Sequence, residues 1–198
     1  MGVAMEHEYK SYTIKIEQDN SAESPREWDN LGTMVCFHRR YSLGDKHNFE
    51  TPKEVQEHIK KTDAIWLPLY LYDHSGITMN TTGFSCPWDS GQVGVIFIEK
   101  EKIYKEYNVK RITQKLIDRV KKVLIGEVKT FDQFLIGDVH GYVVEDSTGN
   151  HVNSCWGYYG EEECLKEAKS IVDCECKANS IVFIKSLEEE NNGGTYEK

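Results

Sequence analysis

The sequence predicts an α+β protein with a largely antiparallel sheet and three to four helices. Its 198 residues are enough for one good hydrophobic core. Short apolar runs bounded by turn-forming residues predict strands, and apolar residues at helical spacing predict helices. The resulting order of elements, ββαββααββαβ, mixes hairpins with helices and therefore favours the α+β class.

Two strands and a helix are predicted in the first third of the chain. Residues 9–18 alternate polar and apolar side chains, as a half-buried strand does, and residues 33–38 form a second apolar run. Residues 51–54 read Thr-Pro-Lys-Glu. This pattern combines a capping threonine, a proline at the first helical position and a glutamate three residues after the cap. It predicts a helix that reaches about residue 61.

The middle of the chain is predicted to hold two neighbouring strands followed by two helices. The strands cover residues 64–72 and 92–99, and Pro68 places the first of them at an edge or at a bulge. A short helix is expected at residues 100–107. Residues 110–124 form the clearest helix of the sequence, because their apolar residues cover one face.

The C-terminal part is predicted to hold a hairpin, a helix and a last strand. Residues 139–146 and 151–159 are two strand-like runs joined by a turn that contains glycine. Residues 161–173 begin with three acidic residues, which favour the start of a helix. Residues 181–184 are predicted as a final short strand.

The predicted elements divide into three parts. We expect a main α+β domain at residues 1–136. A hairpin-helix-strand annex at residues 137–187 is expected to pack on it. Residues 188–198 are expected to be a disordered acidic tail.

Composition and hydropathy predict a folded, soluble, cytosolic protein. Hydrophobic residues make up 39% of the chain and aromatic residues 11%, while the mean hydropathy is -0.58. No apolar run approaches the roughly 18 residues that span a bilayer. The N-terminal residues lack the pattern of a secretion signal. We expect the protein in the cytoplasm, including the cytosol of an infected host cell, with no membrane partner.

The net charge of -9 is unevenly distributed along the sequence. Residues 1–99 carry a net charge of -6, residues 100–122 a net charge of +6 and residues 123–198 a net charge of -9. One basic element is therefore set in an acidic chain. Acidic surfaces repel nucleic acid and attract basic proteins, including the nucleic-acid-binding grooves of other proteins.

The six cysteines and the glycine-rich segments give no sign of a cofactor. A cytosolic chain keeps its thiols reduced. Cys174 and Cys176 form a single close pair without a second pair at a familiar zinc spacing. The sequence has no P-loop and no G-x-G-x-x-G after a strand. We expect no cofactor.

Residues 137–141, Gly-Asp-Val-His-Gly, and residues 149–151, Gly-Asn-His, resemble motifs of the calcineurin-like metallophosphoesterases. In that family these motifs hold two metals that clamp a phosphoryl group and activate water. The resemblance implies Asp138 and His140 as metal ligands, with His151 as a further one. The family's intervening G-D-x-x-D element and its long spacers are missing. Ordinary hairpin-turn chemistry is therefore favoured, and a metal-dependent phosphoesterase is an alternative.

The polar stretch between the two middle strands contains the atoms of a nucleophile, a base and an orienting acid. These are Asp73, His74, Ser75 and Cys86. Adjacent Asp and His residues rarely orient each other as a triad requires, and no nucleophile signature surrounds Ser75 or Cys86. We therefore expect no catalytic residue here, and we interpret the stretch as a recognition loop or a brace of the fold.

The helix predicted at residues 110–124 carries a basic stripe opposite its apolar face. The stripe consists of Arg111, Lys115, Arg119 and Lys122. A solvated helix face is the favoured interpretation, because Asp118 and the acidic remainder of the chain weaken the field. An accessory protein that binds nucleic acid through these four residues is the second alternative, and direct nucleic-acid binding is not favoured.

Aromatic residues in polar or Gly-rich contexts, together with nearby carboxylates, are the candidates for a protein interface. Interfaces use aromatic side chains surrounded by polar groups as anchors. The candidate interaction residues are Trp28, Asp29, Asp73, His74, Trp88, Asp89, Trp156, Tyr158, Glu161, Glu162 and Glu163.

Four segments carry a resemblance to a known group of proteins. They are SPREWDNLGTMVCFHRRYSLGD, YDHSGITMNTTGFSCPWDSGQVG, DQFLIGDVHGY and SCWGYYG. Over roughly residues 10–175 the chain resembles an uncharacterised family of small proteins encoded by bacteriophages and mobile elements. The resemblance implies an accessory protein that antagonises host defence, such as an anti-CRISPR or anti-restriction protein.

The leading functional hypothesis follows from the charge and from this resemblance. The protein is expected to bind and inhibit a host nucleic-acid-processing defence complex through an acidic surface that bears aromatic residues. The expected partner is a host defence nuclease or effector protein.

Overall fold

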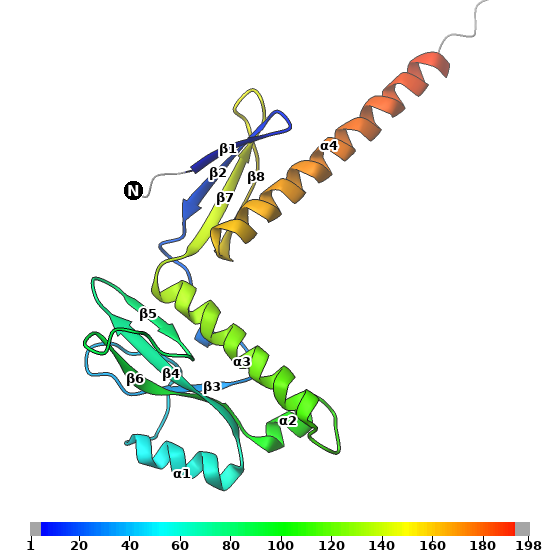
Figure 1. Ribbon diagram of the computed structural model, residues 1–198. Coiled ribbons are helices and arrows are strands. Elements are labelled where there is room, and N and C mark those ends of the chain that lie inside the picture. The colour runs from blue at the N-terminus through cyan, green and yellow to red at the C-terminus, as the bar shows by residue number, and fades with distance from the viewer. Residues whose placement is uncertain (1–4, 193–198) are drawn as a thin grey trace, which may run out of the picture. The chain divides into compact units, whose positions relative to one another are not determined.

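The computed structural model describes residues 5–192, with side chains described for 5–178, 180 and 181. The chain divides into two compact units (Figure 1). The terminal unit comprises Met1–Ala22 and Asp138–Lys198, and the central unit comprises Glu23–Gly137. Each unit contains one four-stranded antiparallel sheet, and the described residues form four α-helices. The α+β class with antiparallel sheets is confirmed.

The central unit is built on a sheet with the strand order β3-β6-β4-β5. Its strands are β3 (Thr33–Cys36), β4 (Ile65–Asp73), β5 (Ile77–Asn80) and β6 (Ser90–Ile98). The predicted pairing of the two middle strands is confirmed, since β4 and β6 are antiparallel neighbours. Pro68 lies one residue before a bulge at Leu69 and Tyr70, and β5 pairs with β4 only from Tyr70 onward. No strand of the described residues pairs with Pro68 on the β5 side, so the missing N–H of the proline costs no hydrogen bond of the sheet there.

Three helices accompany this sheet. They are α1 (Pro52–Thr62), α2 (Lys100–Glu106) and α3 (Gln114–Leu135). Neighbouring strand residues point to opposite faces. Met34 and Ile96 therefore pack in the core that contains α3, whereas Val35 packs with Val55 of α1. The two helices thus cover opposite faces of the sheet (Figure 1).

The predicted helix starts are largely confirmed. The Thr51 hydroxyl accepts a hydrogen bond from the Glu54 backbone N–H at 3.3 Å, and the Glu54 carboxylate accepts one from the Glu50 N–H at 2.9 Å. This is a variant of the capping box that the Thr-Pro-Lys-Glu pattern predicts, because Glu54 binds the Glu50 N–H and the Thr51 hydroxyl in place of the Thr51 N–H. The prediction at residues 100–107 corresponds to α2.

The helix predicted at residues 110–124 was misplaced at both ends. It begins at Gln114, where Thr113 caps it, and it continues through Gly126 to Leu135. Val128 and Phe131, beyond the glycine, are buried in the core. Tertiary packing of the continued apolar stripe therefore outweighs the cost of about 1 kcal/mol that a glycine adds inside a helix.

The terminal unit contains a second sheet with the strand order β1-β2-β7-β8 and one helix. Its elements are β1 (Met5–Tyr9), β2 (Tyr12–Gln18), β7 (Val139–Glu145), β8 (His151–Tyr159) and α4 (Glu161–Asn192). Buried residues of β2 and β7 pack against the first part of α4. These core residues are Ile14, Ile16, Tyr142, Val144, Cys164, Ala168 and Val172.

The N-terminal hairpin belongs with the C-terminal part of the chain. The single strand predicted at residues 9–18 is a hairpin, whose turn residues Lys10 and Ser11 both have positive φ. Strand β2 then pairs with β7. This pairing puts residues 5–22 in the same unit as the β7–β8 hairpin, which the sequence assigned to a separate annex.

The prediction of a last strand at residues 181–184 is wrong. This segment continues α4, which runs from Glu161 to Asn192 rather than ending at residue 173. No glycine or proline interrupts residues 161–192, so nothing local stops the helix. Residues 188–192 of the predicted disordered tail also belong to α4, and residues 193–198 lie outside the described residues.

Candidate interaction surfaces

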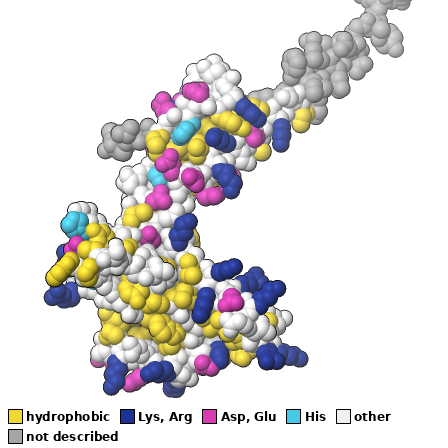
Figure 2. Space-filling view, in the orientation of Figure 1, with side chains coloured by type: hydrophobic (Ala, Val, Ile, Leu, Met, Phe, Trp, Pro, Cys, Tyr) yellow, Lys and Arg dark blue, Asp and Glu magenta, His cyan; other side chains and the backbone are white. Residues whose placement is uncertain are grey.

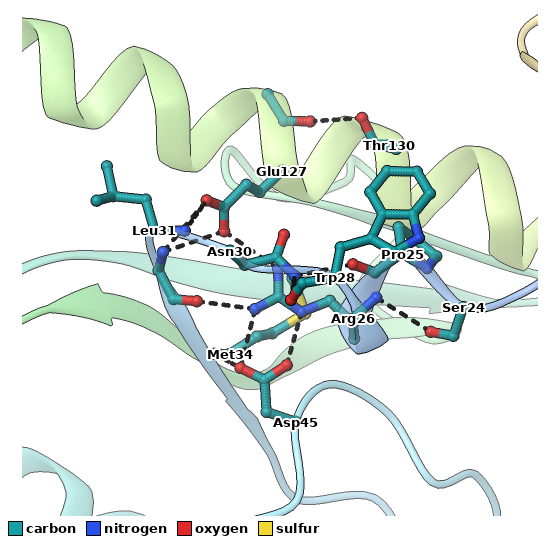
Figure 3. A network of polar contacts seen from close by, with 12 residues as sticks. Ser24, Pro25, Arg26, Trp28, Asn30, Leu31, Met34, Asp45, Glu127 and Thr130 are labelled. Carbon is teal, nitrogen blue, oxygen red and sulfur yellow. Dashed lines mark hydrogen bonds and ion pairs between the residues drawn. The ribbon is translucent and has the colours of Figure 1, made fainter.

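A buried ion-pair network holds the loop that carries Trp28 (Figure 3). The Arg26 side chain is only 4% exposed. Its Nε and Nη2 donate to the two Asp45 carboxylate oxygens at 2.7 and 2.8 Å, and its Nη1 donates to Glu127 at 3.1 Å. Nη2 also donates to the Gly32 carbonyl at 2.8 Å. A bidentate guanidinium with satisfied partners can remain charged when it is buried.

The same two carboxylates also bind backbone N–H groups. Glu127, on α3, accepts hydrogen bonds from the Leu31 and Gly32 N–H groups, and Asp45 accepts one from the Met34 N–H at 2.8 Å. The segment before β3 is thereby fixed to α3 and to the loop that follows β3. Trp28 lies in this segment with 49% of its surface exposed. Trp28 is therefore half-exposed on a loop whose backbone is held by these hydrogen bonds.

Asp73, His74, Ser75 and Cys86, which the sequence does not favour as a nucleophilic site, are not arranged as a triad. His74 Nδ1 and Cys86 Sγ each lie 3.5 Å from Asp89 Oδ2. Asp73 is bound by Arg40 and by the Tyr41 hydroxyl, so it does not orient His74. The backbone of Ser75 has a positive φ, which places this residue in a turn. These groups tie together the loops at one end of the sheet.

Trp88 is the most exposed large apolar side chain of the described residues, at 92%. It adjoins Asp89, whose carbonyl accepts a hydrogen bond from the Asp73 N–H at 2.8 Å. Tyr72 contacts both His74 and Phe84 beside it. The structure therefore brings together the predicted interaction residues Asp73, His74, Trp88 and Asp89 on a braced set of loops, with Trp88 pointing into solvent.

The basic stripe predicted on α3 is exposed. Arg111 lies just before the helix, Lys115, Arg119 and Lys122 lie on it, and all four are exposed. The Arg119 guanidinium lies 5.4 Å from the centre of the Tyr107 ring. Figure 2 shows Lys and Arg side chains gathered over α2 and the start of α3. The stripe is a solvated basic face of the central unit.

The outer face of the terminal sheet carries Trp156. Gly141 leaves room for its indole, because a Cβ at position 141 would overlap the Trp156 ring. Trp156 is 46% exposed. Tyr158, by contrast, contacts Tyr142 with ring centres 5.6 Å apart, on the side where α4 packs. Of these two predicted interaction residues, Trp156 is therefore the one with a large exposed surface.

The first turn of α4 presents carboxylates next to this sheet. Glu162 and Glu163 are exposed, and Glu161 is partly exposed. Glu167 is exposed one turn further along the helix. Glu163 forms an ion pair with Lys166 at 3.1 Å, an exposed pair worth little free energy.

The predicted metal ligands do not form one cluster. Asp138 and His140 lie together, with His140 Nε2 3.0 Å from Asp138 Oδ1. His151 pairs with Glu145 at the opposite end of β7 and contacts Ser154 at 3.1 Å. Within the described residues, no group of three or more His, Cys, Asp or Glu side chains is placed to hold a metal ion.

The cysteines of the described residues are free thiols. Cys36 and Cys164 are buried, and burial raises the pKa of each to about 12. Both are therefore neutral thiols at physiological pH, and a neutral thiol is a poor nucleophile and a poor metal ligand.

The division into two units separates the charge of the protein. The terminal unit holds 17 acidic and 7 basic residues, a net charge of -10, whereas the central unit holds 16 acidic and 17 basic residues, a net charge of +1. Three lysines of the terminal unit, Lys10, Lys15 and Lys166, are each engaged by a carboxylate of the same unit. The excess of negative charge is thus a property of one unit.

Sequence reasoning missed the residues that support these surfaces. Arg26, Arg40, Asp45 and Glu127 are partners of residues far away in the sequence. The only local sign of a structural role is that Arg26 and Asp45 lie in segments otherwise rich in turn-forming residues. A charged residue there is equally compatible with solvent exposure.

Comparisons with protein-family models, with curated proteins and with solved structures find no match to this chain. Within the described range, no helix combines the length and the apolar composition that crossing a membrane requires. Beyond the resemblance noted in the sequence, the interpretation of function depends on the surfaces themselves.

Proposed function

We propose that this protein is a binding protein that inhibits a nucleic-acid-processing defence complex of a host cell by occupying a basic groove on it. The observation that carries this proposal is the net charge of -10 on the terminal unit, whereas the central unit is nearly neutral. A compact body with this charge is attracted to the surfaces that bind the phosphate backbone of nucleic acid. The resemblance to phage-encoded proteins makes a defence nuclease or effector the expected partner.

The terminal unit supplies negative charge and an aromatic side chain on different faces of its sheet, because α4 covers one face and Trp156 lies on the other. We assign the contact with the basic groove to the α4 face, and Trp156 is a separate anchor point. Glu162, Glu163 and Glu167 are exposed on α4 and provide negative charge. Trp156 provides a large apolar side chain on the outer face of the sheet. Charge complementarity accelerates association and selects the partner, whereas a desolvated aromatic side chain contributes most of the affinity.

Affinity capture from host lysate tests this proposal. The immobilised full chain is expected to retain a nuclease or effector, and single-stranded DNA added as competitor is expected to release it. The variant E162Q/E163Q/E167Q removes three charges from the terminal unit and is expected to retain much less of that protein. Retention by the wild type is expected to fall as salt is raised from about 0.1 M to about 1 M, because salt screens surface charge.

A matched variant separates the position of the charge from its amount. E57Q/E101Q/E106Q removes three exposed glutamates from the central unit and is expected to behave like the wild type. The proposal fails if the wild type captures no nuclease or effector. It also fails if both triple variants lose the captured protein to the same extent.

A further inference from the structure

The loop that follows β3 borders a polar hollow of about 450 Å³ in the central unit, which is open to solvent. This volume lies within the range of about 300–1,000 Å³ that small-molecule sites occupy. The walls are rich in groups that donate hydrogen bonds or carry positive charge. They include His38, Arg39, Arg40, Ser42, Asp45 and Lys46.

Two cations in these walls have no internal partner. Arg39 and Lys46 are exposed, and the structure gives neither side chain an ion pair or a hydrogen bond with any described residue. The one carboxylate of the hollow, Asp45, has both oxygens occupied by the Arg26 guanidinium and the Met34 N–H. The hollow therefore keeps an uncompensated positive charge.

Arg40 adds a third cation that is only partly neutralised. Its Nη2 is bound to Asp73, at the edge of the Trp88 loops, and its side chain remains 66% exposed. A guanidinium has five N–H donors, so this contact leaves most of them available. A carboxylate that binds one edge of an arginine also fixes the direction of the other edge.

His38 presents a donor of defined orientation. Its Nδ1 accepts hydrogen bonds from the Arg40 and Tyr41 backbone N–H groups, each at 3.3 Å. In the neutral ring the proton is then on Nε2, which leaves that N–H as a possible donor. The ring also stacks on Tyr41, with centres 5.1 Å apart and planes 11° apart, so its position is fixed.

A neighbouring hollow of about 680 Å³ shares the same basic wall. His38, Arg39 and Arg40 line it together with Phe37, Gln92 and Val93. No carboxylate lines this second hollow. An anion that approaches the loop from either side meets the same donors.

We propose that the loop of residues 38–46 is a binding site for the phosphoryl group of a small phosphorylated molecule. A phosphate monoester carries a charge of about -1.5 to -2 at neutral pH and three acceptor oxygens. The two unpaired cations match that charge, and guanidinium groups match the geometry of phosphate oxygens. His38 Nε2 and the Ser42 hydroxyl supply further donors. A ligand with a carboxylate in place of the phosphate has a single charge and two acceptor oxygens, so it would leave some of these donors and part of the positive charge without a partner.

Titration of the full chain with inorganic phosphate and with adenosine 5′-monophosphate tests the site. Backbone amide NMR is expected to show saturable shifts concentrated at residues 38–47. R39A/K46A is expected to weaken binding at least about tenfold. K121A/K129A, which removes two exposed lysines from α3, is expected to stay within about twofold of the wild type. S42A is expected to weaken binding without any loss of charge.

Outcomes of two kinds contradict the proposal. Shifts that do not saturate, or equal losses in R39A/K46A and K121A/K129A, would show general attraction of anions. Binding of a single-stranded oligonucleotide with no binding of either small phosphate would assign the wall to a polynucleotide.

Tighter binding of adenosine 5′-monophosphate than of inorganic phosphate identifies a phosphate ester as the ligand, and equal binding identifies free phosphate. Because both substituted side chains of R39A/K46A are exposed, its amide spectrum is expected to remain that of the folded chain.

Discussion

Arg26 Nη1 lies 3.1 Å from Glu127 Oε2, and the two side chains are only 4% and 12% exposed. The other edge of the same guanidinium binds Asp45. One buried cation therefore serves two carboxylates, which in turn accept the N–H groups of Gly32 and Met34. The segment before β3 owes its position to this single side chain.

Replacing Arg26 by alanine is expected to destabilise the central unit strongly. It leaves the Asp45 and Glu127 carboxylates without their counter-charge in a poorly solvated place. Such losses cost about 3–5 kcal/mol of the free energy of unfolding. Urea denaturation followed by tryptophan fluorescence measures the change. Arg111→Ala, at an exposed arginine, is the control and is expected to stay within about 0.5 kcal/mol of the wild type. A loss below about 1 kcal/mol for Arg26→Ala would show that the network is dispensable.

Asp132 is expected to be the residue that holds β5 to α3. Its Oδ1 accepts hydrogen bonds from the Thr78 hydroxyl and the Met79 N–H, each at 2.7 Å. Asp132→Ala leaves a backbone donor unpaired beside the core, which costs about 1–3 kcal/mol. Hydrogen exchange of the Met79 amide measures the local effect and is expected to become faster. Asp132→Asn keeps an acceptor oxygen and is expected to lose less. Equal exchange rates in all three proteins would refute this role.

The elements that the sequence predicted well have local causes. Helix α1 was predicted from its first residues because Thr51 and Glu54 complete a cap with their own neighbours. The elements that were missed depend on distant contacts. Strand β5 is only four residues long and is held by β4 and by Asp132. The apolar spacing that continues from Leu124 through Val128 and Phe131 does indicate the extension of α3, but Gly126 is expected to weaken the helix, and only the core contacts of Val128 and Phe131 show that it does not end there.

The sequence predicted which residues lie on the candidate surfaces, but not how these residues are arranged. Trp88 and Asp89 were recognised from composition, whereas the Arg40–Asp73 pair joins residues 33 positions apart. Most of the negative charge of the terminal unit was visible in the sequence, because residues 138–198 carry a net charge of -8 and residues 1–22 add only -2. What stayed hidden is that β2 pairs with β7, which places both segments in one unit. Strand pairing over such a distance has no signal in one sequence.

Gly141 and Trp156 are expected to be energetically coupled. A methyl group at position 141 would overlap the indole, so Gly141→Ala must displace the ring and is expected to cost about 1–3 kcal/mol. In a Trp156→Ala background the same substitution meets no ring and is expected to be nearly neutral. A double-mutant cycle by urea denaturation and far-UV circular dichroism measures the difference, expected to be at least about 1 kcal/mol. Additive effects would place Trp156 away from the glycine in solution.

Asp146 is expected to make the β7–β8 hairpin sensitive to acid. Hydrogen bonds from the Thr148 hydroxyl, at 2.7 Å, and from the Asn150 and Thr148 N–H groups lower the pKa of its carboxyl to about 2. Because the pKa is lower in the folded hairpin than in the unfolded chain, ionised Asp146 stabilises the hairpin at every pH above about 4. That stabilisation is lost as the pH falls from about 4 to about 2.

Carbon-13 NMR of the Asp146 carboxyl measures this titration directly. The midpoint is expected near pH 2 in the wild type and closer to the ordinary value of 3.8 in Thr148→Val, which removes the strongest hydrogen bond. Amide exchange in the turn is expected to accelerate over the same pH range, and to do so at higher pH in the variant. If the midpoint does not move in Thr148→Val, the hydroxyl is not what holds the carboxylate in its ionised form.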